Sequence, residues 1–145
     1  MIQAQAITPP PATGLARQAG PGAADMPDPI LVTRAREAYR RRRERERMFE
    51  TDLFADPAWD MLLDLFVARA EGRPTCISSA CIGANVPTTT ALRYLDCLCE
   101  AGFVRRVRHP TDARSRLVEL TDQAVGLMVG YLGWVLENEE RVGQV

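Results

Sequence analysis

The chain contains no lysine, only one histidine, and no apolar segment long enough to span a bilayer. Its most apolar run, from Ala124 to Leu136, is well short of the roughly 20 residues that a membrane-spanning helix needs. No charged start is followed by an apolar stretch and a cleavage site, so no secretory signal is expected. These absences argue against membrane-spanning and secreted proteins, and they predict a cytoplasmic protein whose cysteines are mostly reduced.

The motifs of common enzyme classes are also missing. No phosphate-binding loop, dinucleotide-binding fingerprint or nucleophile–base pattern occurs in the sequence. The single histidine, His109, cannot build the usual zinc site, and the four cysteines lack the short paired spacing of a zinc ribbon. The sequence therefore predicts a protein without catalytic residues, cofactor or metal.

What the chain does contain is sufficient for one domain with a real core, since 46% of its 145 residues are hydrophobic. The net charge of −1 excludes an unstructured basic coat protein, but the charge is uneven along the chain. Residues 101–121 carry five arginines against two carboxylates, whereas residues 51–100 carry three against seven. Because the local field at a surface decides what it attracts, residues 101–121 are expected to form a basic island.

The first segment, residues 1–28, is expected to be a disordered tail, because it is rich in Pro, Gly and Ala and has few large apolar groups. Asp28 as a cap and Pro29 in the first turn then predict a helix over residues 29–49. This helix includes the run Arg40–Arg47, in which two glutamates are interleaved. The run is read either as a solvated face with Arg–Glu pairs or as a phosphate-facing surface.

Three further helices follow before the strands. Asp56 and Pro57 begin a core helix that Gly72 ends. A short helix of small residues is expected from Thr75 to Ala84, and after a turn the next helix runs from Pro87 to Ala101 and is closed by Gly102.

Residues 103–108 are typical of a strand, and a second strand is expected to end at Thr121. Helix, strand, basic turn and strand in this order indicate a winged helix-turn-helix. The predicted fold class is mainly α with a small β-hairpin (α+β), with additional helices at both ends of the chain. The turn between the strands concentrates positive charge, which has little to gain inside a core and much to gain beside a phosphate chain.

A last helix is predicted from the cap at Thr121–Asp122 to about Arg141. It is apolar on nearly every side, and a helix of that kind must be buried all round. Three glycines, at positions 126, 130 and 133, permit close approach of another helix. A two-fold homodimer interface is the economical explanation. The alternative is a helix sunk into its own domain.

Two stretches resemble the MarR family of bacterial transcription regulators. Residues 86–102 are similar, without gaps, to that family's recognition helix; the shared residues are Thr90, Arg93, Leu95, Asp96, Leu98, Glu100 and Gly102. Residues 112–121 match the family's more specific wing pattern, Asp-x-Arg-Ser/Ala-x-x-Val-x-Leu-Thr. Departures are Pro87, which stands one position before the family's usual proline, and Cys97 and Cys99 at positions that are usually charged.

The resemblance implies a dimer whose first and last helices intertwine, with the recognition helix in the major groove and the wing in an adjacent minor groove. It also implies that Arg114 is the minor-groove contact. Asp112 would orient the wing through an ion pair with a basic neighbour. Relatives often bind small aromatic ligands, so a small-molecule effector of unknown identity is an expected partner.

The candidate DNA-binding residues lie on the recognition helix and in the wing: Thr88, Thr89, Thr90, Arg93, Arg108, His109, Arg114 and Arg116. The three threonine hydroxyls can bond phosphates and base edges, or they can cap backbone amides. Arg93 can reach a guanine or a phosphate, or it can pair with Asp96. The wing arginines suit a narrow minor groove, although they can also be merely solvated charges.

The four cysteines, Cys76, Cys81, Cys97 and Cys99, are mostly expected to be buried small hydrophobes, and a redox switch is the alternative. Taken together, the sequence predicts a sequence-specific, homodimeric regulator that binds double-stranded DNA. Residues 55–121 form the DNA-binding part, and residues 29–54 and 122–145 the dimerisation elements. The alternatives are a winged-helix protein-interaction module without DNA binding and a cysteine-based redox-sensing regulator.

Overall fold

The computed structural model describes residues 27–144. The disorder predicted for residues 1–28 therefore falls almost entirely outside the described residues. The last two residues of that segment are ordered, because Pro27 is buried and the Asp28 carboxylate accepts a hydrogen bond from the backbone N–H of Ile30 at 2.9 Å. That hydrogen bond is the predicted cap of the first helix.

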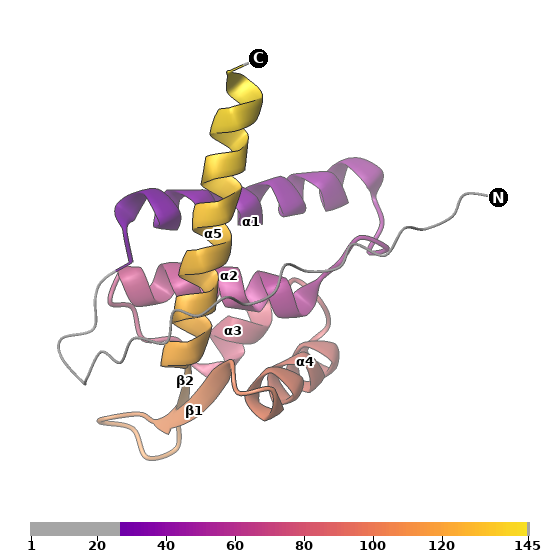
Figure 1. The fold of residues 1–145 in the computed structure, drawn as a ribbon. Helices are drawn as coiled ribbons and strands as arrows, with labels where there is room; N and C mark the ends of the chain where they lie inside the picture. Colours follow the sequence, from indigo (N-terminus) through magenta and orange to yellow (C-terminus); the bar gives the residue numbers. More distant parts are fainter. Residues whose placement is uncertain (1–26, 145) are drawn as a thin grey trace.

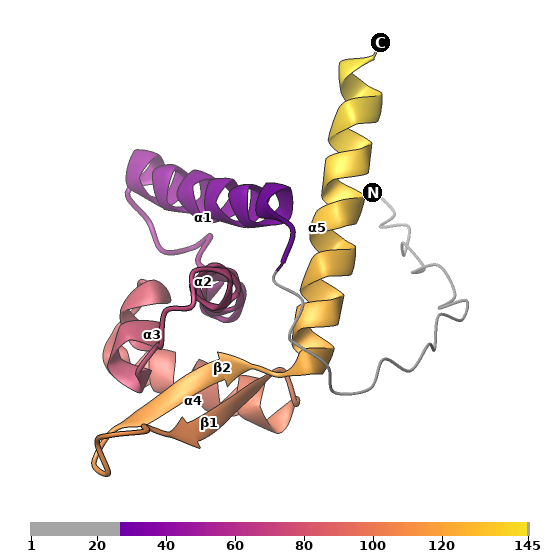
Figure 2. The ribbon, with the colours of Figure 1, turned by 90° about the vertical axis from the view of Figure 1, so that its left-hand side faces the viewer.

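Five helices and one hairpin follow in the order α1 (Pro29–Phe49), α2 (Pro57–Ala70), α3 (Ile77–Gly83), α4 (Thr88–Glu100), β1 (Val104–Arg108), β2 (Arg116–Leu120) and α5 (Asp122–Gly143). Helix α4 and the hairpin lie at one end of the molecule, and the C-terminal half of α5 extends past α1 at the other end (Figures 1 and 2). The predicted mainly helical fold with a winged helix-turn-helix is confirmed.

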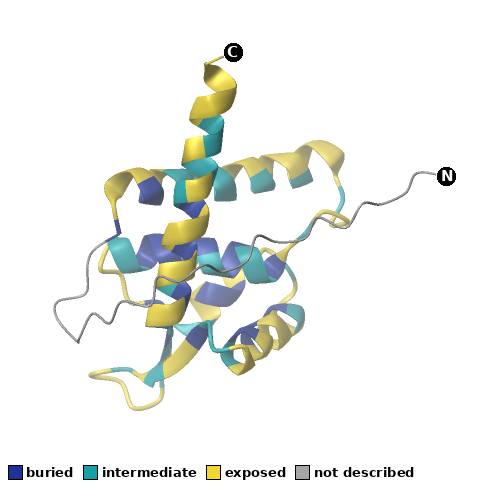
Figure 3. Ribbon diagram, in the orientation of Figure 1, coloured by how far each residue is buried: buried dark blue, intermediate teal, exposed yellow. Residues whose placement is uncertain are grey.

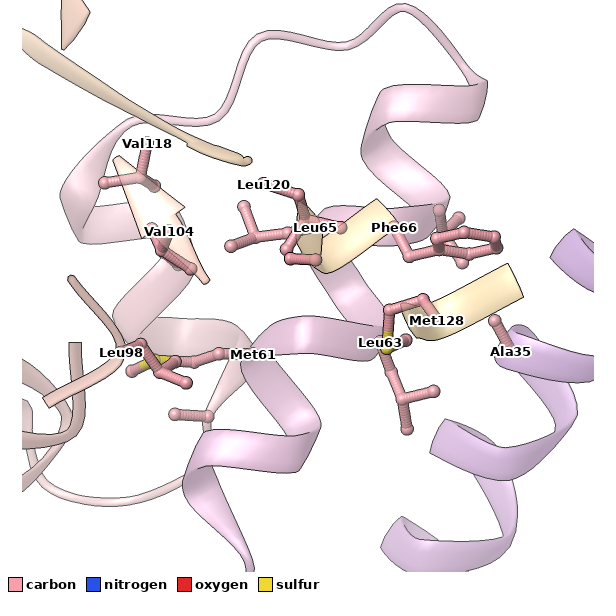
Figure 4. Packing of buried hydrophobic residues seen from close by; sticks show 14 of the residues in the cluster. Ala35, Met61, Leu63, Leu65, Phe66, Leu98, Val104, Val118, Leu120 and Met128 are labelled. Atoms are coloured by element: carbon pink, nitrogen blue, oxygen red, sulfur yellow. The ribbon is translucent and has the colours of Figure 1, made fainter. Parts of the chain in front are cut away.

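Helix α2 is the centre of the core. Its side chains Met61, Leu63 and Phe66 are fully buried, and they meet apolar residues from α4, both strands and α5 (Figure 4). Burying a side chain of this size stabilises the fold by about 1.5–3 kcal/mol. Local signals set the bounds of α2, since Asp56 caps its start and Gly72 follows its end with a φ of 64°.

The hairpin is antiparallel, with Val104 opposite Leu120 and Arg108 opposite Arg116. A third segment joins it: the C=O of Thr75 accepts the N–H of Val118 at 2.8 Å, and Cys76 bridges Leu117. The helix predicted to begin at Thr75 therefore begins only at Ile77. Thr75 and Cys76 stay outside the helix, and Cys76 is extended, because the edge of β2 pairs with this segment.

Polar contacts fasten α1 to the rest of the chain. The carboxylate of Asp60, which is completely buried in α2, accepts a hydrogen bond from Arg42 Nε at 2.5 Å and another from Arg43. Neither reading of the Arg40–Arg47 run anticipated this inward turn of two arginines. Only the outer part of the run is a solvated face, where Arg47 pairs with Glu44 at 2.6 Å.

Helix α1 is also bonded to the helix-turn-helix. The Tyr39 hydroxyl donates to the C=O of Gly83 at 2.7 Å, and the side-chain amide of Asn85 donates to Glu46 at 3.1 Å. Asn85 occupies the left-handed region, with a φ of 53°, in the turn between α3 and α4. The position of this turn is therefore tied to α1.

Helix α5 buries only one face within a single chain, so the alternative of a helix sunk into its own domain is wrong. Ala124, Met128 and Leu132 are buried. The side chains around the rest of the helix include large apolar groups that are about half exposed: Leu127, Tyr131 and Trp134. In Figure 3 much of the α5 ribbon carries the colour of exposed residues.

Candidate nucleic-acid interface

Helix α4 presents a polar face to solvent. Ala91, Leu95 and Leu98 recur at helical spacing and are buried against the core, which leaves the opposite face outward. Thr88, Thr89 and Arg93 lie on exposed positions, whereas Thr90 is half-buried. Gly102, with a φ of 78°, ends the helix and turns the chain into β1.

The threonine hydroxyls are not used as caps. Pro87 occupies the N-cap position of α4, and no side-chain hydrogen bond caps this end of the helix. The hydroxyls of Thr88 and Thr89 are therefore available to an external partner.

Residues 109–115 connect the strands through a turn that local hydrogen bonds shape. His109 Nδ1 accepts the backbone N–H groups of Thr111 at 3.2 Å and of Asp112 at 3.1 Å. Asp112 in turn accepts the backbone N–H of Arg114 at 3.0 Å. Within residues 27–144 Asp112 forms no ion pair, so it holds the turn through the backbone instead of through the expected basic neighbour.

The arginines of this end fall into two sets. Arg105 pairs with Glu119 across the hairpin at 2.5 Å, and Arg106 pairs with Asp96 of α4 at 2.5 Å. The second set makes no ion pair with any described carboxylate, and all its members are exposed: Arg93, Arg108, Arg114 and Arg116. The intrahelical pair considered for Arg93 does not form, because Asp96 is bonded to Arg106.

The register of the hairpin adds a feature that sequence reasoning missed. Arg108 and Arg116 are direct cross-strand partners, so their side chains leave the same face of the sheet. Like charges opposite one another destabilise a hairpin, and no described carboxylate neutralises this pair. Arg114 lies in the turn before β2 begins, so strand alternation does not place it beside Arg116. The arrangement favours an anionic partner at this surface.

The cysteines do not behave as predicted, because only Cys81 is buried. Cys76 is half-exposed just before α3, and its Sγ lies 3.1 Å from the hydroxyl oxygens of Ser78 and Ser79. These hydroxyls lower the pKa of the Cys76 thiol to about 7, whereas burial raises the pKa of Cys81. The spacing Cys-x-Ser-Ser before a helix was the signal available in the sequence.

A largely apolar pocket of about 300 Å³ lies between α2 and α5. Trp59 and Tyr131 line it and contact each other edge to face, with ring centroids 5.0 Å apart.

Among residues 27–144 no three His, Cys, Asp or Glu side chains gather as ligands for a metal ion. No helix in the described part of the chain combines the length and apolarity needed to cross a bilayer.

No protein-family model matches the sequence, and no curated protein is significantly similar to it. Solved structures do share its fold. S. aureus MepR in a DNA-binding conformation is 14% identical, with a TM-score of 0.50 over 80% of this chain and 82% of its own. Transcriptional regulator PA4135 is 22% identical, with a TM-score of 0.50 over 81% and 83%. S. aureus MepR bound to ethidium bromide is 14% identical, with a TM-score of 0.50 over 79% and 80%. The resemblance to MarR-family regulators is confirmed at the level of the fold.

Proposed function

We propose that the protein is a homodimeric transcriptional regulator that binds double-stranded DNA in a sequence-specific manner. The observation that carries this proposal is the pair Arg108 and Arg116, which face each other on the hairpin without a carboxylate partner among residues 27–144. A phosphate chain supplies the missing negative charge. The fold shared with MepR in its DNA-binding conformation supports the same conclusion.

In the proposed complex, α4 enters the major groove. Thr88, Thr89 and Thr90 bond phosphates and base edges, and Arg93, about one turn further along, reaches a guanine or a phosphate. Thr88 and Thr89 are exposed, and their hydroxyls are not engaged in capping the helix, as this role requires. Such a regulator works in the cytoplasm and carries no catalytic site.

The wing enters the adjacent minor groove. A narrow minor groove concentrates negative potential and attracts a guanidinium, which also donates hydrogen bonds in a planar fork. Arg114 at the hairpin tip is the proposed groove contact, and Arg108 and Arg116 bind the flanking backbone. His109 and Asp112 hold the turn in shape through their bonds to its backbone N–H groups.

The dimer is proposed to form through α5, with residues 29–54 as a second dimerisation element. The large apolar side chains of α5 that stay exposed in one chain would be buried by a second copy. At Gly126, Gly130 and Gly133 an added Cβ would come within 4 Å of no other segment of residues 27–144, so that surface is open to another helix. Two subunits related by a two-fold axis present two wings and two recognition helices to a roughly palindromic site.

Gly130→Glu is expected to convert the dimer into a monomer, because it places a charged side chain on the surface where the second helix packs. The subunit itself should keep its stability or gain a little, since glycine is about 1 kcal/mol less favourable than alanine inside a helix. Sedimentation velocity at micromolar concentration measures the oligomeric state. Ile82→Glu, at an exposed apolar residue of α3 that lies outside both proposed dimerisation elements, is the control. A Gly130→Glu protein that stays dimeric contradicts the proposed interface.

A salt titration on random duplex DNA tests the function against the alternative of a protein-interaction module. The regulator should bind with an affinity that falls steeply as salt rises, and each phosphate-contacting arginine that is removed should lower the slope by about one unit. Arg108→Gln is the informative variant. A module without DNA binding shows no affinity and no slope, and that result would refute the proposed function.

The apolar pocket between α2 and α5 is the proposed effector site. Its aromatic walls fit a flat, largely apolar molecule, and MepR is seen with the planar compound ethidium bound. Because α5 is also the proposed dimer helix, occupancy of this pocket would alter the relation between the two subunits. Quenching of tryptophan fluorescence by added ethidium, abolished by Leu127→Asp, is the expected result.

A second candidate function, redox sensing, is favoured by Cys76. Its thiol pKa of about 7 makes roughly half of it thiolate at neutral pH, and it lies between α3 and the wing strand β2. The thiolate is the reactive form, so reactivity should rise as the pH increases through 7. Mild peroxide is expected to oxidise Cys76 and weaken DNA binding.

Iodoacetamide labelling at pH 7, read by mass spectrometry, is expected to modify Cys76 faster than Cys97, although Cys97 is the more exposed of the two. Cys76→Ser should abolish the effect of peroxide on DNA binding, while Cys97→Ser should leave it unchanged. Normal DNA binding by the peroxide-treated wild-type protein would eliminate redox sensing.

A further inference from the structure

A second pocket, distinct from the apolar one, lies where the wing meets the end of α2. It has a volume of about 290 Å³ and is lined by the last turns of α2, by residues 72–75 and by residues 117–120 of β2. With roughly 30 Å³ for each water-sized group, it has room for about ten such groups. No residue of this pocket belongs to the proposed DNA-binding surface.

The pocket forms where the segment before α3 separates from β2. This segment pairs with β2 only at Thr75 and Cys76. The C=O of Thr75 accepts the N–H of Val118, so the next rung of an antiparallel ladder would join Arg73 to Leu120. Between residues 27 and 144 no backbone hydrogen bond fills that rung, and Pro74 stands where the segment diverges. Successive backbone N–H groups of a strand point in opposite directions. Because the Thr121 N–H bonds to the C=O of Phe103, the neighbouring Leu120 N–H points away from β1. The pocket wall thus offers a backbone donor without a backbone acceptor.

Two guanidinium groups border the same pocket, and both have weak partners. Arg69 is 3.5 Å from Asp122, whose side chain is 94% exposed. Arg73 is 3.2 Å from Glu71 and 3.7 Å from Asp64, and it is itself about half exposed. Exposed ion pairs of this kind contribute little, so a better-placed anion can replace them. The pocket's own carboxylate, Glu119, is paired with its cross-strand partner Arg105 of β1.

The floor of the pocket is apolar. Leu65, Ala68, Val118 and Leu120 line it, and each residue is at most 3% exposed. A ligand that satisfies the whole pocket therefore combines one anionic head with a short hydrocarbon body. Inorganic phosphate supplies the charge but leaves the floor unused, whereas a carboxylate on a small aliphatic chain or ring uses both.

We propose that this pocket is a binding site for a small organic carboxylate. Its head is bound by Arg69, Arg73 and the Leu120 N–H, and its hydrocarbon part rests on the α2–β2 floor. Because β2 is both a wall of the pocket and the second strand of the wing, occupancy changes the position of the wing relative to α2. The binding site is independent of the proposed function, and only this coupling to the wing rests on it.

Hexanoate and cyclohexanecarboxylate are the probes, and calorimetry on the full chain without DNA is the first measurement. Both are expected to bind, while hexanol, which lacks the charge, is expected to bind at least tenfold more weakly. Arg73→Gln and, separately, Arg69→Gln should each weaken hexanoate binding roughly tenfold, the scale of one charge-assisted hydrogen bond. Arg141→Gln, remote from the pocket on α5, should leave it unchanged.

Several results would overturn the site: neither carboxylate binding at 10 mM, equal affinity for hexanol, inorganic phosphate competing as well as hexanoate, or full affinity in both folded Gln variants.

The coupling between the pocket and DNA binding is tested by a second measurement. Saturating hexanoate should shift DNA affinity, and DNA should shift hexanoate affinity by the same factor. If hexanoate does not change DNA affinity, the proposed coupling is wrong. If the protein binds hexanoate but no DNA, the proposed function is refuted and the proposed binding site is retained.

Discussion

Arg114→Ala is expected to weaken DNA binding by about 1–3 kcal/mol, or about 5- to 150-fold, at moderate salt. Arg114 lies in the turn that bonds from His109 and Asp112 hold in shape, and no described carboxylate pairs with it. The substitution therefore removes the proposed minor-groove contact, and it breaks no ion pair with a described carboxylate. Fluorescence anisotropy with a labelled duplex, recovered by selecting bound fragments from the source genome, measures the change.

Arg105→Ala is the matched control for this prediction. Arg105 lies in the same hairpin and is similarly exposed, but its guanidinium is bonded to Glu119 at 2.6 Å. Its removal should change the affinity far less than the removal of Arg114 does. If the two variants bind equally well, the proposed division between paired and unpaired arginines is wrong.

Asp60→Ala is expected to lower the free energy of unfolding by about 3–5 kcal/mol, the scale for removing one partner of a buried ion pair. Arg42 and Arg43 both reach the Asp60 carboxylate, and their side chains are only 14% and 21% exposed. Without it, Arg42 loses its only described carboxylate partner, and Arg43 keeps only Glu46, at 3.2 Å. Burial raises the pKa of Asp60, and the two arginines oppose that shift. Urea denaturation followed by circular dichroism gives the difference.

Asp122→Ala is the corresponding surface control. Asp122 also accepts from an arginine, Arg69, but its side chain is almost fully exposed. Its loss should cost no more than about 1 kcal/mol, the upper end for exposed pairs. A second test is to replace Arg42, Arg43 and Asp60 together by apolar residues, which should restore much of the stability. An Asp60→Ala protein as stable as the wild type would show that the buried pair contributes nothing.

The helix boundaries were predictable because their signals are local. Asp28 with Pro29, and Asp56 with Pro57, mark the starts of α1 and α2, while Gly72 and Gly102 follow the ends of α2 and α4. Each of these residues acts through a hydrogen bond or a φ angle within a few positions of itself. The residue pattern, a helix closed by Gly102 and followed by a strand, a basic turn and a second strand, also placed α4 and the hairpin in the correct order.

Features that depend on contacts between distant segments were missed. Asp60 reads as a polar residue in the first turn of an amphipathic helix, and nothing near it in sequence shows that α1 delivers two arginines to it. The opposition of Arg108 and Arg116 depends on the hairpin register, and the pairing of Thr75 with Val118 depends on the edge of β2. Periodicity reports which face of an element is apolar, but it does not report which partner a polar group will find.

The hydrogen bonds that Tyr39 donates to Gly83 and Asn85 donates to Glu46 have a mechanical consequence. They attach α1 at two points to the segment that leads into α4, and the Asp60 ion pairs prevent α1 from sliding along α2. We therefore expect a tilt of α1 to move the start of α4 with it. In the proposed dimer on DNA, a change in the angle between the two α1 helices would therefore change the distance between the two α4 helices and their fit to successive turns of the double helix.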